Sequence, residues 1–274
     1  MLNNINIILF IITIIFYFIG ALLSISFFLS RKESVFNIAR YIILLSFIFH
    51  TATLLARYIE SGYLPLTSLF EAILFFTWLI VLLFILVEKR YQLSVLGVFI
   101  IPLTFLSLSY ALILPKDISP LNPILKSAWL GIHVTLILLG NAAFAIAFGL
   151  GIMYLLQERQ LKSRKQGLFY YRLPSLEILD DLGYKALSFG FPFLTLGIIT
   201  GSIWAKYAWG SYWNWDPKLV WSLITWLIYA SLLHGRLTIG WRGRKAAFIS
   251  IIGFLCVVFT FVGVNFLLKT EHLF

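Results

Sequence analysis

Four histidines are the residues of this sequence best suited to bind a transition metal: His50, His133, His234 and His272. Imidazole is a common axial ligand of haem iron, and an ionisable residue at or within a membrane helix often marks a functional site. A hydrogen-bonded interior histidine is the simpler interpretation of any one of them alone. Their positions relative to one another therefore decide more than any single residue does.

Aromatic side chains are concentrated in the segment WGSYWNWD, residues 209–216. A membrane aromatic belt spreads its rings over many helix ends, whereas here the rings gather at one loop and its flanks. A flat hydrophobic ligand would use such a surface, with indole N–H groups at the wet edge. Chemistry alone leaves a ligand platform and a plain belt both open. The tryptophans concerned are Trp204, Trp209, Trp213, Trp215 and Trp221.

The two other notable residues of this segment have structural explanations. Asp216 precedes Pro217 and an apolar run. Asp is a favoured helix N-cap and Pro is favoured at the first helical position, so Asp216 is predicted to cap a helix. Gly210 lets the backbone turn or approach a ligand closely.

The composition is that of an integral membrane protein. Of 274 residues, 61% are hydrophobic and 12% are charged, and the mean hydropathy is +0.96. Such a chain has too few polar residues to cover a soluble surface. The net charge of +10 falls in short loops between apolar runs, which indicates orientation in a lipid bilayer and not nucleic-acid binding. The single cysteine, Cys256, lies in an apolar run and offers neither an internal disulfide nor a CxxC motif.

We predict an all-α fold with about eight transmembrane helices in a single polytopic domain, residues 1–274. A helix that crosses the hydrocarbon needs about 20 mainly apolar residues. The first run is interpreted as a retained span, because no charged n-region or cleavage site accompanies it. The candidate spans are 6–29, 38–58, 66–87, 91–113, 127–156, 184–205, 217–235 and 246–268.

Lysine and arginine predict the orientation of these spans. Most basic residues follow the first, third, fifth and seventh spans, so these loops are expected on the cytoplasmic side. Both termini and a tryptophan-rich loop at 204–218 are then expected on the extracytoplasmic side. The long inner loop, residues 157–181, is expected to be partly helical.

This topology sorts the histidines by depth. His133 and His272 are expected near the face that carries the tryptophan-rich loop. His234 is expected near the inner end of its span, about 25 Å deeper, so it cannot share a metal with those two. If His234 binds a metal, its mate belongs to another polypeptide. His50 is expected about 12 Å deep, which does not favour a pair with His234.

The segment from Trp209 to Asp216 resembles the tryptophan-rich WWD signature of haem-handling proteins in cytochrome c maturation. The surroundings resemble the CcsA (ResC) branch of the system II synthases. Leu219 departs from the pattern, since the family often has an acidic residue after Pro-Lys. The chain resembles the single-chain form, without the large soluble domain of the partner. The similar segments are ESGYLPLTSLFEAILFF, AWLGIHVTLILLG and PKLVWSLITWLIYASLLHGR, and the resemblance covers most of the chain.

The resemblance implies haem b as cofactor and a set of binding residues. His133 and His272 would be the axial ligands of the iron of an outer haem. His234 would bind haem iron at an inner site, opposite a histidine of a partner subunit. His50 has no secure family role and stays a second metal-ligand candidate. The residues that would cradle the outer haem are Trp209, Gly210, Trp213, Trp215 and Asp216.

The implied function is that of a haem-handling and haem-export subunit of a cytochrome c synthase of the haem lyase type. It would present haem at the outer face for thioether attachment to the CxxCH motif of apocytochrome c. No residue resembles a general base or a nucleophile, so catalysis would rest on positioning. The implied partners are a CcsB/ResB-type membrane protein, apocytochrome c and a thiol-reducing thioredoxin-like protein. The expected location is a bacterial plasma membrane, with the thylakoid membrane as the alternative.

Two other functions stay open at the level of sequence. A small-solute transporter predicts polar residues or broken helices at the bilayer midplane, for which Gly140 and Asn141 are the only hint. A b-type electron-transfer subunit predicts paired histidines at matching depth. Near the N-terminus, Ser68-x-x-Glu71 predicts a capping box at the start of the third span.

Overall fold

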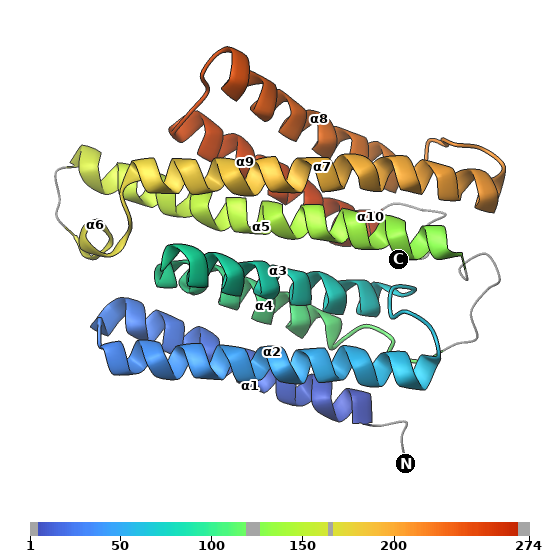
Figure 1. Ribbon diagram of the computed structural model, residues 1–274, viewed down its shortest axis with the longest axis horizontal. Coiled ribbons are helices and arrows are strands. Elements are labelled where there is room, and N and C mark those ends of the chain that lie inside the picture. The colour runs from blue at the N-terminus through green and yellow to red at the C-terminus, as the bar shows by residue number, and fades with distance from the viewer. Residues whose placement is uncertain (1–4, 119–126, 164–166, 268–274) are drawn as a thin grey trace. The chain divides into compact units, whose positions relative to one another are not determined.

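The computed structural model describes residues 5–118, 127–163 and 167–267, and all regular structure in these ranges is helical (Figure 1). The predicted all-α class is therefore confirmed for the described residues. The chain forms two compact units, residues 1–120 and 121–274. The loop with the tryptophans, His133 and His234 belong to the second unit, whereas His50 belongs to the first.

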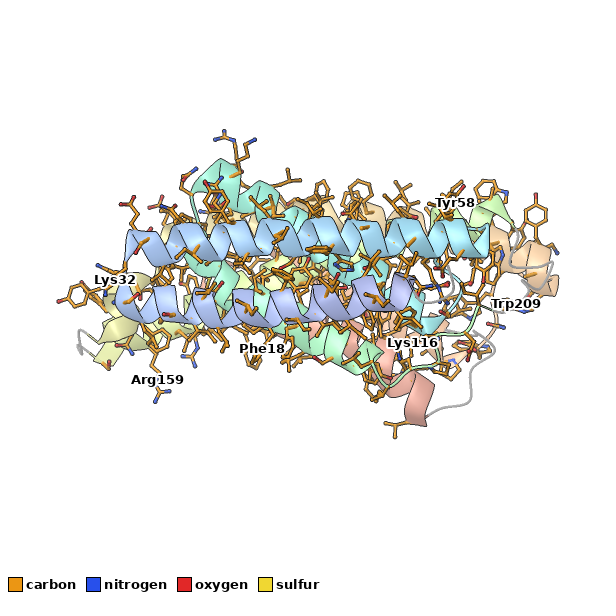
Figure 2. The ribbon with its side chains drawn as sticks, turned by 90° about the horizontal axis from the view of Figure 1, so that it is seen from below. Phe18, Lys32, Tyr58, Lys116, Arg159 and Trp209 are labelled. Carbon is orange, nitrogen blue, oxygen red and sulfur yellow. The ribbon has the colours of Figure 1, made fainter. Side chains whose placement is uncertain are left out.

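The first unit is a bundle of four long helices (Figure 1). α1 packs against α2 and α4, and α3 packs against α4 and α2. Figure 2 shows Lys32 at one end of this bundle and Tyr58 with Lys116 at the other end. The elements are α1 (Ile5–Ser30), α2 (Glu33–Ser61), α3 (Leu69–Tyr91), the short 3₁₀ turn η2 (Ser94–Leu96) and α4 (Gly97–Ala111).

A buried ion pair closes the Tyr58 end of the first unit. Glu71 accepts from Arg57 Nε at 2.9 Å, and both side chains are almost fully buried. The Arg57 guanidinium also donates to the carbonyl oxygens of Lys116 and Asp117. These bonds join α2, α3 and the segment after α4. Because the buried charges of Arg57 and Glu71 are paired and hydrogen-bonded, we interpret the cluster as structural.

The predicted capping box at Ser68 and Glu71 is confirmed in one half. Ser68 Oγ accepts from the Glu71 backbone N–H at 3.2 Å. The Glu71 carboxylate accepts from the N–H and the hydroxyl of Thr67, each at 2.9 Å. Glu71 therefore serves the start of α3 and the ion pair with Arg57 together.

The second unit is built on two long helices that lie side by side, α5 and α7 (Figure 1). α9 packs on α5, and α8 packs on α9 and α7. Figure 2 shows Arg159 and Trp209 at opposite ends of this unit. The elements are α5 (Ala128–Ser163), α6 (Leu168–Arg172), α7 (Leu176–Trp209), α8 (Pro217–Thr238), α9 (Arg244–Val258), the π-helix η4 (Phe259–Gly263) and α10 (Val264–Leu267).

Glycines let α5 and α7 approach closely. A Cβ added at Gly140 would lie 2.8 Å from Leu194 N, and one added at Gly190 would lie 2.8 Å from Gly140 O. Small residues at such crossings permit backbone-to-backbone packing in membrane helices. Gly140 therefore has a packing role in an unbroken helix.

Seven helices of the described residues are long and apolar enough to cross a membrane, consistent with an integral membrane protein. The predicted seventh span, 217–235, is present as helix α8 but is not among those seven helices. Its composition explains this, because Lys218, His234 and Arg236 lower its apolarity. Each predicted span overlaps a described helix, but the bounds differ. Several helices extend further than the spans, whereas the predicted spans 66–87 and 91–113 begin before α3 and α4.

The connections refine two predictions. The inner loop, residues 157–181, is partly helical as predicted, since α5 continues to Ser163 and α6 lies within it. The tryptophan-rich segment, predicted as a loop over 204–218, is a loop only over 210–216. No proline or glycine lies between Gly201 and Gly210, so α7 continues through Trp209.

Candidate functional site

The loop at 210–216 is defined by a glycine at its start and an aspartate at its end. Gly210 has φ 78° and donates its N–H to Lys206 O, which ends α7. Lys206 Nζ donates back to Gly210 O at 2.8 Å. Asp216 caps α8, since its Oδ1 accepts from Lys218 N at 2.8 Å, and Pro217 follows at the first helical position. The predicted Asp216 cap is confirmed. Gly210 and Asp216 together fix the two ends of the loop.

The indole rings of the segment meet edge to face. Trp204 and Trp209 have centroids 4.9 Å apart and planes at 73°, and Trp213 and Trp215 have centroids 6.1 Å apart and planes at 89°. Trp204 is buried, whereas Trp215 is 82% exposed. A flat ligand can lie against one ring of such a pair while it meets the edge of the other. The cluster thus offers both ring faces and ring edges at its exposed side.

A π-helix, which the sequence did not predict, lies beside the start of α8. Trp221 packs on Phe259, the first residue of η4, with ring centroids 4.4 Å apart. A Cβ at Gly263 would lie 2.5 Å from the Phe259 ring, so this glycine gives the ring its place. π-Helical turns occur frequently at functional sites. The only sequence signal for this π-helix is the segment FTFVG, in which two phenylalanines precede a glycine.

His133 lies on α5 and faces α7. Its Nδ1 is 2.7 Å from the carbonyl oxygen of Gly197. A carbonyl can only accept, so the hydrogen is assigned to Nδ1 and the lone pair to Nε2. A Cβ at Gly201 would lie 2.5 Å from Nδ1 and Cε1 of the ring, so this glycine makes room for the imidazole. Metal-binding histidines commonly donate their second nitrogen to a carbonyl in this way.

The His133 imidazole and the tryptophans are joined by α7. Trp204 lies one turn beyond Gly201, and Trp209 lies about 12 Å beyond it along the helix axis. The structure therefore brings His133 close to the base of the aromatic cluster. The other predicted outer ligand, His272, lies outside the described residues.

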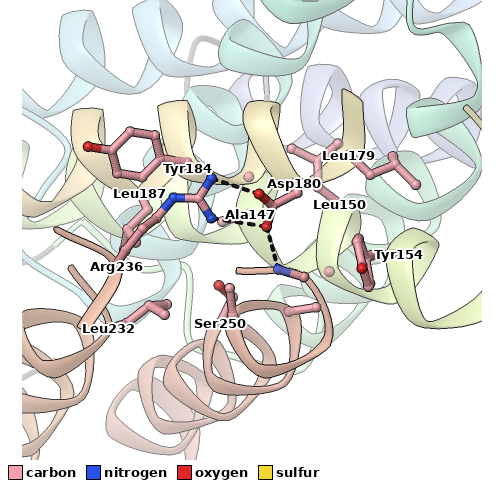
Figure 3. Close-up of a pocket in the computed structure, with 15 residues that line it drawn as sticks. Ala147, Leu150, Tyr154, Leu179, Asp180, Tyr184, Leu187, Leu232, Arg236 and Ser250 are labelled. Atoms are coloured by element: carbon pink, nitrogen blue, oxygen red, sulfur yellow. Dashed lines mark hydrogen bonds and ion pairs between the residues drawn. The ribbon is translucent and has the colours of Figure 1, made fainter. Parts of the chain in front are cut away.

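His234 is exposed on α8, near the opposite end of the second unit. An ion pair two residues further on fixes this helix end: both Arg236 terminal nitrogens bind the Asp180 carboxylate, at 3.0 and 2.7 Å (Figure 3). Gly243 N–H donates to Asp180 at 2.8 Å, and the Arg236 guanidinium lies over the Tyr184 ring. Asp180 thus joins α7, α8 and the turn before α9.

The pocket around Asp180 is a small gap in the helix packing and is too small for a ligand. Its volume is about 20 Å³ (Figure 3), which is enough for about one water molecule. The sequence alone does not single out Asp180, because its partner Arg236 is 56 residues away. What the arrangement achieves is a fixed position for the α8 end that presents His234.

His50 is placed differently from the other candidates. It is fully buried, and its Nδ1 lies 3.3 Å from the Tyr17 hydroxyl of α1. Its Nε2 has no hydrogen-bond partner among the described residues. The rings of Tyr17 and His50 pack edge to face, with centroids 5.8 Å apart. Within the described residues, no group of three or more His, Cys, Asp or Glu side chains forms a metal site.

Known proteins similar to this chain come from one biological process. A family model described as cytochrome C assembly protein matches residues 66–272. The chain is 37% identical to a cytochrome c biogenesis protein CcsA of Guillardia theta, over 98% of this chain and 94% of the relative. It is 36% identical to the protein of the same name in Prochlorococcus marinus (strain AS9601), over 93% and 90%.

A solved structure described as cytochrome c heme lyase CcmF has a similar fold. The TM-score is 0.68 at 17% sequence identity, and the match covers 97% of this chain and 47% of that one. At this identity the similarity concerns the fold alone. The tryptophan-rich loop, His133 and His234 lie within the range of the family match, whereas His50 precedes it.

Proposed function

Since the chain belongs to the cytochrome c assembly protein family, with a role in cytochrome c maturation, we propose that it is the haem-handling subunit of a cytochrome c synthase. In this proposal it receives haem b and presents it at the extracytoplasmic face for attachment to the CxxCH motif of apocytochrome c. Its membrane is a bacterial plasma membrane or a thylakoid membrane, which suits the relatives in Prochlorococcus marinus and Guillardia theta.

The observation that carries the proposal is the environment of His133. The hydrogen bond to Gly197 O assigns the lone pair to Nε2, which is the donor that haem iron takes from histidine. Gly201 leaves the imidazole its space against α7. The donor set therefore fits a haem axial ligand, with His272 as the proposed second ligand.

The tryptophan loop is proposed to orient the same haem. Trp209, Trp213 and Trp215 give ring faces and edges at an exposed surface. Gly210 and Asp216 hold the two ends of the loop, so the rings are fixed to α7 and α8. Burial of porphyrin surface against indoles would position the haem edge while leaving it accessible to a second protein.

The protein contributes binding and orientation, and the haem vinyl groups contribute the alkenes to which the cysteine thiols of apocytochrome c add. Holding the reacting groups together lowers the entropic part of the barrier. A thioredoxin-like protein that keeps those thiols reduced is a proposed further partner.

An inner haem site is proposed at His234. The exposure of this side chain on α8 suits a ligand shared with a second polypeptide, for which a CcsB/ResB-type membrane protein is proposed. The Asp180–Arg236 ion pair would hold the helix end against displacement by that partner. Asn141 and Gly140 lie in the continuous helix α5, where Gly140 serves packing, so a transporter with a broken helix finds no support there.

The test is the visible spectrum of the protein purified with a CcsB-type partner, in oxidised and reduced forms. His133→Ala is expected to lower the retained haem at least tenfold, and added imidazole is expected to restore part of it by refilling the ligand position. c-Type cytochrome should fall in parallel. Unchanged haem content and unchanged cytochrome c in His133→Ala would refute the outer-ligand assignment.

A further inference from the structure

The first unit contains a cavity that the proposed function does not use. Its volume is about 260 Å³, and it lies between α1, α2, α3 and α4. All four helices contribute residues from the same end, where the turns at 31–32 and 92–93 lie. Figure 2 shows Lys32 at this end of the unit. Its lining includes Ser24, Phe27, Phe36, Arg40, Phe84 and Lys89.

The interior of the cavity is apolar. Phe27 and Phe36 form one wall, with ring centroids 5.1 Å apart. Phe84 forms another and lies against Gly97, where an added Cβ would be 3.1 Å from the ring. The Ser24 hydroxyl donates to Gly20 O at 2.8 Å, so the serine is already satisfied. The interior therefore suits a hydrocarbon chain, which needs no hydrogen-bond partner.

The rim of the cavity carries positive charge. Arg40 Nε lies 3.9 Å from Glu88 Oε2, and Arg40 is about half exposed whereas Glu88 is nearly buried. Because this separation is longer than a hydrogen bond, the guanidinium keeps donors for another anion. Lys89 is exposed beside it and adds a second cation to the lining. An acidic head group is therefore complementary to this rim.

We propose that the cavity binds an anionic phospholipid, with one acyl chain between the phenylalanines and the phosphate at Arg40 and Lys89. The volume of about 260 Å³ lies below the roughly 300–1,000 Å³ of pockets that enclose a drug-sized ligand, so the cavity suits part of one acyl chain and is too small for a porphyrin. Basic pockets between membrane helices on the cytoplasmic side are known to bind anionic lipid head groups. The basic turn at 31–32 is on the side that the charge pattern predicts to be cytoplasmic.

The experiment is a native mass spectrometry titration of the full chain, purified in neutral detergent, with phosphatidylglycerol or phosphatidylcholine. One phosphatidylglycerol molecule is expected to be retained in preference to phosphatidylcholine. Arg40→Gln and Lys89→Gln should each weaken phosphatidylglycerol binding about fivefold. Lys32→Gln is the matched control, because it removes the same charge at the same end outside the cavity lining.

A second variant tests the acyl-chain part separately from charge. Ala39 lines the cavity and is buried, so Ala39→Leu would extend into the space and is expected to reduce retention of the lipid. The proposal is overturned if phosphatidylcholine binds equally well, if Lys32→Gln weakens binding as much as Arg40→Gln, or if haemin displaces the bound lipid one for one. The phosphatidylglycerol titration itself needs no haem, so the retention of lipid can be tested independently of the proposed synthase function.

Discussion

His133 and His50 are both helix residues whose Nδ1 lies within hydrogen-bond distance of an oxygen atom, yet their surroundings differ. His133 faces a carbonyl at 2.7 Å, in a space left by Gly201. His50 faces the Tyr17 hydroxyl at 3.3 Å and is fully enclosed by the first unit. A hydroxyl can donate or accept, so the contact at His50 leaves its tautomer undetermined, whereas the carbonyl at His133 does not.

The difference is between an imidazole with a defined donor nitrogen, His133, and one packed between helices, His50. A haem ligand needs a defined lone pair, and the carbonyl contact defines one at His133, whereas the hydroxyl contact at His50 does not. His50 instead belongs to a polar seam between α1 and α2 that also includes the pair Thr13 and Thr53, with hydroxyls 3.3 Å apart. Such interhelical polar contacts stabilise packing in membranes by modest amounts.

The largest effect on retained haem is expected when the space beside His133 is filled. Gly201→Ala places a Cβ where the ring now lies, so the imidazole must move, and we expect retained haem to fall about 10- to 100-fold. Gly183→Ala on the same helix is the control, because a Cβ there meets nothing within 4 Å. Haem absorbance per protein measures both. Equal haem in the two variants would refute the role of the Gly201 space.

A smaller effect is expected at Asp216, where two variants separate capping from charge. Asp216→Ala removes the side-chain acceptor for Lys218 N and should cost about 1 kcal/mol of stability, with haem retention lowered a few-fold. Asp216→Asn keeps a good cap and should preserve both. Thermal unfolding and haem absorbance are the measurements. Loss of haem in the Asn variant with unchanged unfolding would show that the carboxylate charge acts on the ligand.

The smallest effect on haem is expected at His50. His50→Leu should leave haem retention within about twofold while it lowers thermal stability, because the buried Tyr17 hydroxyl then lacks its partner, a loss of about 1–3 kcal/mol. The double variant Tyr17→Phe with His50→Leu should regain part of that stability. Haem lost to the same extent as in His133→Ala would overturn the distinction between the two histidines.

The helices could be predicted because long apolar runs have few alternatives in a bilayer. Their ends could not, since α5 and α7 continue past the apolar runs with polar residues that also favour helix. The cap at Asp216 was predictable because the interaction is local. The contact of His133 with Gly197 joins residues 64 positions apart, and its only sequence signal is the pair of glycines four residues apart on α7.

The charged end of α8 has a consequence for how the protein is made. An arginine costs about 2.5–3.5 kcal/mol when a helix inserts alone with that residue at its centre, and less near its end. Arg236 finds its carboxylate on α7, and α8 is not among the seven described helices that are long and apolar enough to cross a membrane. The Asp180 carboxylate of α7, which precedes α8 in the chain, would therefore be in place to receive Arg236 when α8 is added.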